Sequence, residues 1–73
     1  MEWRDRINID PEIQGGTPVI KGTRVAVQIV VGSLAGGMTV QEVCDEYGVT
    51  EDQVRAALAY AADTVANERV MAL

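Results

Sequence analysis

The side chains of this chain include few of the groups that enzymes use for catalysis. The 73 residues contain no histidine and a single cysteine, Cys44, so no imidazole is available to activate a thiol. Adjacent carboxylates occur at Asp45 with Glu46 and at Glu51 with Asp52, but neighbouring positions on a helix do not face each other. No cluster of cysteine and histidine has the spacing of a metal site. The sequence therefore predicts a protein that is not an enzyme and that has no cofactor and no metal site.

Two glycine-containing segments have part of the composition of a phosphate-binding loop. They are Gly-Gly-Thr-Pro at residues 15–18 and Lys-Gly-Thr-Arg at residues 21–24. A Walker loop needs four residues between its first glycine and the Gly-Lys-Ser/Thr group, and a helix must follow. The order in this chain is different, so neither segment is predicted to hold a nucleotide in that way.

Nucleic-acid binding is the next activity that the residue types allow. Gln53 and Arg55 stand near the start of a predicted helix, and both side chains can form hydrogen bonds with base edges. A basic group in the first half of the chain can supply phosphate contacts if its strands fold beside that helix: Arg4, Arg6, Lys21 and Arg24. The alternative is that these cations pair with the acidic residues of the same half: Asp5, Asp10 and Glu12.

The net charge of −5 lies entirely in the second half of the sequence. Residues 1–26 contain four acidic and four basic side chains, whereas residues 27–73 contain seven acidic side chains and two arginines. Because Lys and Arg supply most of the affinity for duplex DNA, Glu51 and Asp52 beside Arg55 argue against strong DNA reading by that helix. The same acidic surface suits a basic protein partner.

Two helices joined at a glycine would position these residues. Apolar side chains follow the spacing of one helix face in two successive segments: Val40, Val43, Cys44 and Tyr47, then Val54, Ala57, Leu58 and Ala61. Gly48 breaks the pattern between them and is expected to hold a positive φ at the turn. Because such a face packs into the core, Leu58 is expected to be buried and Cys44 to be a small core side chain.

Capping boxes mark the starts of both helices. Thr39 is followed by Glu42 and Thr50 by Gln53, so each pair can satisfy backbone N–H groups that the first helical turn leaves without partners. The two segments predict helices at residues 40–47 and 51–70. Two short helices joined at a glycine are typical of a helix-turn-helix.

Short strands and turns are predicted from residue 6 to residue 26. Residues 6–9 alternate polar and apolar side chains, and residues 18–21 form a second stretch that begins at a proline. Residues 24–26 are expected to be a third brief extended piece.

A further helix is predicted at residues 27–35. Its apolar positions share one face, and two glycines follow: Val27, Val30, Val31 and Leu34, then Gly36 and Gly37. The alternative is one valine-rich strand over residues 25–31.

The C-terminal residues form a second apolar stripe, which a partner protein or a second copy can cover. Its members are Ala62, Ala66, Val70, Met71 and Leu73. A chain this short buries only about 60% of its unfolded surface, and one cysteine allows no disulfide within the chain, so at least a homodimer is expected. The alternative is a frayed C-terminus with scattered alanines.

A single cytoplasmic domain over residues 1–73 is expected. No apolar run approaches the roughly 18 residues of a membrane span, and the first residues, MEWRDRIN, lack the apolar segment of a secretory signal. A lone thiol fits a reducing compartment.

One run of residues resembles a known family. It begins INIDPEIQGGTPVIKGTRVAV, of which GGTPVIKGTR is the most specific part, and it continues after the apolar helix as GGMTVQEVCDEYGVTEDQVRAALAYA. Residues 7–62 thereby resemble the small prokaryotic proteins of domain of unknown function 433, described as antitoxins of the VapB type. The resemblance implies a mainly α-helical, winged-helix-like or homeodomain-like three-helix domain with short N-terminal strands. It also implies a partner, often a PIN-like nuclease toxin.

Within this resemblance the Gly-Thr-Arg motif has a structural interpretation. Gly22 permits a tight turn, and Thr23 can bond to the local backbone. Arg24 is expected to bridge to a carboxylate of another element, with Asp10 and Glu12 as candidates. A ligand contact by Arg24 is the alternative.

Together, the sequence and the resemblance predict an antitoxin of a type II toxin–antitoxin pair. We expect it to neutralise its toxin and to regulate its own promoter by binding operator DNA through the helix-turn-helix. The alternative is a protein-interaction or oligomerisation module whose helix-turn-helix is a scaffold without DNA binding. Salt-dependent DNA binding separates the two.

Overall fold

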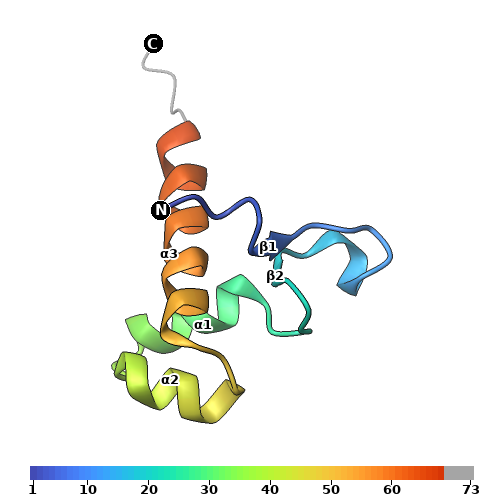
Figure 1. Cartoon of the computed structure of the whole chain (residues 1–73). Helices are drawn as coiled ribbons and strands as arrows, with labels where there is room; N and C mark the ends of the chain where they lie inside the picture. The colour runs from blue at the N-terminus through green and yellow to red at the C-terminus, as the bar shows by residue number, and fades with distance from the viewer. Residues whose placement is uncertain (69–73) are drawn as a thin grey trace.

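The computed structural model describes residues 1–68, which form three α-helices, one short 3-10 helix and a two-stranded antiparallel sheet (Figure 1). In chain order the elements are β1 (Ile7–Asn8), η1 (Gln14–Gly16), β2 (Val19–Ile20), α1 (Val27–Ala35), α2 (Val40–Tyr47) and α3 (Glu51–Asn67). The predicted fold class, mainly α-helical with a small N-terminal β element, is confirmed. Val70, Met71 and Leu73 of the expected interface stripe lie outside the described residues.

Both capping boxes form, and they set the starts of α2 and α3. The Glu42 N–H donates to Thr39 Oγ1 at 3.1 Å, and the Thr39 N–H donates to the Glu42 carboxylate at 2.9 Å. Thr50 and Gln53 make the same exchange at 3.1 and 2.8 Å. Gly48 ends α2 with φ 66°, a conformation that glycine adopts without steric cost. The predicted pair of helices joined at Gly48 is therefore present.

The strands pair in one register. Ile7 lies opposite Ile20, and Asn8 lies opposite Val19. Val19 also forms an isolated antiparallel bridge with Ala26, the last residue of the expected third extended piece. The bridge places the start of α1 directly beside the sheet.

Small aliphatic side chains build the core. The largest fully buried side chains are Ile20, Val19, Val30, Val43 and Val54. They come from β2 and from all three helices. Since α3 packs against α1, α2 and both strands, these side chains meet in one core. Burial of this apolar surface supplies most of the favourable free energy of folding.

The buried face of α3 differs from the prediction at Leu58. That side chain is 40% exposed, whereas Val54, Ala56 and Ala57 are buried. Alanine on the inner face allows the neighbouring elements to approach the helix closely. Leu58 follows Ala57 by about 100° around the helix and faces solvent. The expectation of a buried Leu58 was wrong.

α3 ends before residue 70, where it was predicted to end. Glu68 has extended backbone, with φ −78° and ψ 136°, so the helix stops at Asn67. Val65, in the last turns, is 67% exposed, and Figure 1 shows this end of α3 standing clear of the other helices and the sheet. The last turn has no basic residue to offset the helix dipole. Without packing or charge support, the end of an amphipathic helix is marginal.

Candidate nucleic-acid and protein interfaces

Residues 1–68 offer few groups for catalysis. They contain no set of three cysteine or acidic side chains placed to hold a metal ion, and Cys44 is half-buried and packs against the core. Glu2 and Glu42 accept hydrogen bonds from the backbone N–H groups of Arg4 (2.8 Å) and Thr39 (2.9 Å). These bonds favour the charged carboxylates and lower the pKa of both groups. None of the described helices combines the length and the apolar character needed to span a bilayer.

A tight turn at residues 21–24 follows β2, and we name it the basic turn. Gly22 has φ 79°, which a residue with a side chain rarely adopts. Thr23 Oγ1 donates to the Ile20 carbonyl at 2.7 Å and accepts from the Val25 N–H at 3.0 Å. The threonine hydroxyl therefore fixes the backbone of the turn from within.

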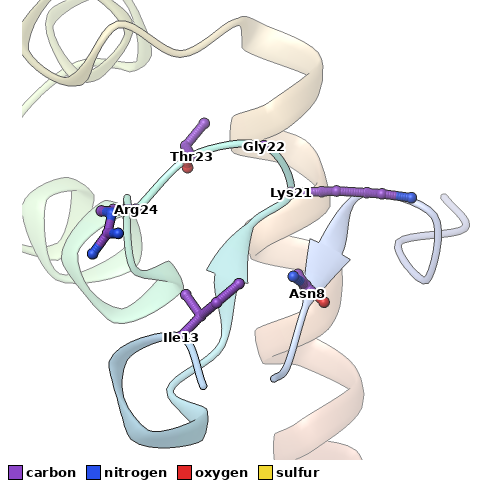
Figure 2. Close-up of a pocket in the computed structure, with 6 residues that line it drawn as sticks. All are labelled: Asn8, Ile13, Lys21, Gly22, Thr23 and Arg24. Carbon is purple, nitrogen blue, oxygen red and sulfur yellow. The ribbon is translucent and has the colours of Figure 1, made fainter. Parts of the chain in front are cut away.

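The basic turn borders an open hollow of about 630 Å³ (Figure 2). Asn8 of β1 and Ile13 line it together with the four residues of the turn. In Figure 2 Lys21 and Arg24 lie on opposite sides of the turn, and both residues are exposed. A hollow of this shape suits an extended ligand better than a small molecule, which proteins usually enclose.

The other basic side chains of residues 1–68 are each paired with a carboxylate. The pairs are Arg4–Glu2 (3.2 Å), Arg6–Asp52 (3.8 Å), Arg55–Glu51 (2.6 Å) and Arg55–Asp52 (3.5 Å). Lys21 and Arg24 form no ion pair within residues 1–68. Within residues 1–68, the basic side chains that have no local counterion are therefore those of the basic turn.

The carboxylate bridge expected for Arg24 does not form within the part of the chain that the structure describes. Asp10 Oδ1 accepts the Glu12 N–H at 2.9 Å in the turn after β1. The Arg24 carbonyl accepts a hydrogen bond of 2.7 Å from Gln14 Nε2. The loop before β2 is thus attached to the backbone of Arg24, and the guanidinium is left exposed.

Gln53 and Arg55, the predicted base readers, both make contacts at the start of α3. Gln53 accepts the Thr50 N–H, and Arg55 contacts the carboxylates of Glu51 and Asp52. Exposed ion pairs contribute at most about 1 kcal/mol, so DNA could compete for Arg55. Base reading by these two side chains stays a prediction.

An apolar groove of about 310 Å³ lies between α1 and α3. No charged residue lines it, and its apolar lining consists of Pro18, Val27, Val31, Tyr60, Ala61 and Val65. Ala62 and Ala66, the described members of the expected interface stripe, are exposed on the same helix. Sequence patterning indicates two walls of this groove, the i, i+4 pair of valines in α1 and Ala61 on the predicted apolar face of α3. It does not indicate that Pro18, from a distant segment, completes the groove.

These elements define a small helix-turn-helix domain with a β-hairpin beside it. The chain belongs to the family described as "Protein of unknown function (DUF433)", which residues 7–61 match. The resemblance seen in residues 7–62 is therefore confirmed.

Two curated relatives share substantial sequence with the chain. It is 50% identical over 50 residues to "Putative antitoxin VapB45" of Mycobacterium tuberculosis, in an alignment that covers 68% of this chain and 21% of the relative. It is 37% identical over 59 residues to "Uncharacterized protein y4eO" of Sinorhizobium fredii, covering 80% of this chain and 27% of the relative. The chain thus spans about a quarter of the length of these relatives.

Two crystal structures share its fold. Rv2018 from Mycobacterium tuberculosis superposes with a TM-score of 0.67 at 46% identity, over 77% of this chain and 27% of that one. A member of the same family from Anabaena variabilis superposes with a TM-score of 0.76 at 30% identity, over 82% of this chain and 60% of that one.

Proposed function

We propose that this protein is the antitoxin of a type II toxin–antitoxin module and neutralises a PIN-like nuclease toxin by binding it. The observation that supports this most directly is the 50% identity to a relative that is named as an antitoxin. The role requires no catalysis and is exercised in the cytoplasm. Because the chain spans about a quarter of its curated relatives, the proposal concerns the function of this domain.

The helical half supplies the surface for the toxin. Exposed carboxylates on α2 and α3 are those of Glu42, Asp45, Glu46, Glu51, Asp52 and Asp63. A nuclease binds a polyanion and therefore has a basic surface, and complementary charge mainly accelerates encounter. The exposed end of α3, with Ala62, Val65 and Ala66, adds apolar area that a groove on the partner can cover.

Co-expression with the protein encoded beside this chain tests the antitoxin role. We expect the full chain to restore growth, because binding masks the nuclease. Val65→Asp places a charge on the exposed end of α3 and should abolish rescue while leaving the fold intact. Ala35→Glu adds the same charge at an exposed position of α1 and serves as the matched control. Rescue by Val65→Asp would show that α3 is not the inhibitory element, and failure of the full chain would reject the antitoxin role.

Regulation of its own promoter is the second part of the proposal. The helix-turn-helix formed by α2 and α3 supports it, while the acidic start of α3 supports the alternative of a pure interaction module. Anisotropy titration of the upstream DNA at low and high salt distinguishes the two, since DNA binding weakens steeply with salt. An absence of binding by the protein and by its toxin complex would leave the interaction module.

We also propose that the protein forms a homodimer. Its largest fully buried side chain is Ile20, so the core is small for an independent domain. A second copy can cover the groove between α1 and α3, which leaves Ala62 and Ala66 for the toxin. Size exclusion with light scattering should return a dimer at micromolar concentration, and a compact 7.8 kDa monomer would contradict this.

A further inference from the structure

Among residues 1–68, the basic side chains that have no ion-pair partner lie at the basic turn and not at the start of α3. Arg4, Arg6 and Arg55 are paired with carboxylates, whereas Lys21 and Arg24 form no ion pair within residues 1–68. A paired cation must lose its partner before it can neutralise a phosphate. Lys21 and Arg24 have no such partner to lose within residues 1–68. They are the described side chains best placed to release counterions from a nucleic acid.

The backbone of the basic turn adds further hydrogen-bond donors. The N–H groups of Lys21, Thr23 and Val25 are occupied by Arg6 O, Ile20 O and Thr23 Oγ1. Those of Gly22 and Arg24 donate to no acceptor among the described residues. Backbone N–H groups exposed in a tight turn are typical parts of anion-binding sites.

The arrangement of the two cations indicates which anion would fit. Lys21 and Arg24 lie on opposite sides of the turn, with Asn8 and Ile13 beside the hollow between them (Figure 2). Two cations on opposite sides of one turn can each contact a different anionic group. A nucleic-acid strand offers phosphates at regular intervals, so each cation can contact a different one.

The basic turn is also connected to the helix-turn-helix. The Lys21 N–H donates to the Arg6 carbonyl at 2.9 Å, and the Arg6 guanidinium pairs with Asp52 in the first turn of α3. The two ion pairs of Asp52 reduce the negative charge at that point. These contacts join the basic turn through Arg6 to Asp52, whose carboxylate is paired with both Arg6 and Arg55.

We infer that the basic turn binds the phosphate backbone of a nucleic acid through Lys21, Arg24 and the N–H groups of Gly22 and Arg24. In this arrangement the turn supplies the affinity that α3 lacks. The inference rests on the proposed promoter regulation, and it specifies which part of the domain holds the DNA.

Salt-dependent anisotropy with a labelled duplex of the upstream sequence tests the inference. The logarithm of the affinity is plotted against the logarithm of the salt concentration between about 50 and 200 mM. Compared with wild type, the slope should be smaller in magnitude by about one for Lys21→Gln and by about one for Arg24→Gln. A scrambled duplex should show the same losses, because phosphate contacts carry no sequence information. Arg69→Gln, which removes the same charge elsewhere, is the control, and circular dichroism verifies that each variant folds.

Each other result overturns the inference in a distinguishable way. If only Arg55→Gln weakens binding, α3 holds the DNA, and promoter regulation stands without the turn. If neither the wild-type chain nor its toxin complex binds either duplex at low salt, both the turn and promoter regulation fail, while co-expression decides the antitoxin role separately. If Lys21→Gln and Arg24→Gln bind DNA normally but no longer rescue growth, the turn contacts an acidic protein surface.

Discussion

Trp3 donates a hydrogen bond of 2.6 Å from its indole Nε1 to the carboxylate of Asp63, sixty residues further along the chain. The same indole meets the ring of Tyr60 edge to face, with centroids 4.8 Å apart. The N-terminal segment is thus attached to α3 beyond the main core. No periodic pattern in the sequence indicates this contact, because Trp3 stands outside every predicted element.

Replacement of Trp3 should weaken the attachment in two measurable steps. Trp3→Phe keeps an aromatic ring but removes the donor, and we expect it to lower the free energy of unfolding by about 1 kcal/mol. Trp3→Ala removes the ring contact as well and should cost about 1–3 kcal/mol. Urea denaturation measures both. Equal stability of wild type and Trp3→Ala would mean that the N-terminal segment is not held to α3 in solution.

The two faces of α3 should respond differently to truncation. Val54 is 1% exposed and Leu58 is 40% exposed. We therefore expect Val54→Ala to lower the free energy of unfolding by about 1–3 kcal/mol, and Leu58→Ala by less than about 1 kcal/mol, although leucine loses more atoms. Thermal melts compare the pair directly. A larger loss for Leu58→Ala would place Leu58 in an interface that forms in solution.

Replacement by alanine should change the free energy of unfolding in opposite directions at two glycine positions. Gly48 has φ 66°, and Gly32 lies within α1; an added Cβ meets no atom within 4 Å at either position. Backbone conformation alone then decides the outcome. Gly48→Ala should destabilise by about 1–2 kcal/mol, and Gly32→Ala should stabilise by about 0.5–1 kcal/mol. Changes of the same sign in denaturant titrations would contradict the left-handed conformation at Gly48.

Acidification should weaken the start of α2. The Thr39 N–H that donates to Glu42 lowers the pKa of that carboxyl below its ordinary value of 4.5. A carboxyl with a lowered folded-state pKa contributes stability that is complete above the unfolded-state pKa and disappears as pH falls through the folded-state pKa. Glu42→Gln keeps an acceptor oxygen that does not titrate. Urea melts from neutral pH to below 4.5 should therefore show a smaller loss for Glu42→Gln than for wild type, and parallel losses would exclude this role of Glu42.

Features governed by neighbouring residues could be predicted from the sequence. The capping boxes at Thr39 and Thr50 act over three residues, and Gly48 acts on its own backbone, so local patterns locate α2 and the start of α3. The bounds of α1 follow from its apolar face and from the glycines after it. Each of these signals lies within one or two helical turns.

Features that depend on distant segments could not be predicted in the same way. Leu58 continues an apolar stripe, and only the positions of α1 and the sheet show that Ala57 takes the inner place. Arg6 and Asp52 are far apart in sequence, so their pair appears only in the folded chain. The expected ion pair between Arg24 and a carboxylate was wrong for the same reason. The availability of the cations at the candidate site therefore depends on tertiary structure.

The small size of the domain has a calorimetric consequence. At about 0.7 kcal/mol per residue, a chain of this length unfolds with an enthalpy of only about 50 kcal/mol, and each kcal/mol of added stability raises Tm by about 4–8 °C. A ligand at about one hundred times its Kd adds about 2.7 kcal/mol. Its binding would raise Tm by roughly 10–20 °C. The melting temperature of the protein is thus a sensitive reporter of whichever partner it binds, whether toxin, nucleic acid or a second copy.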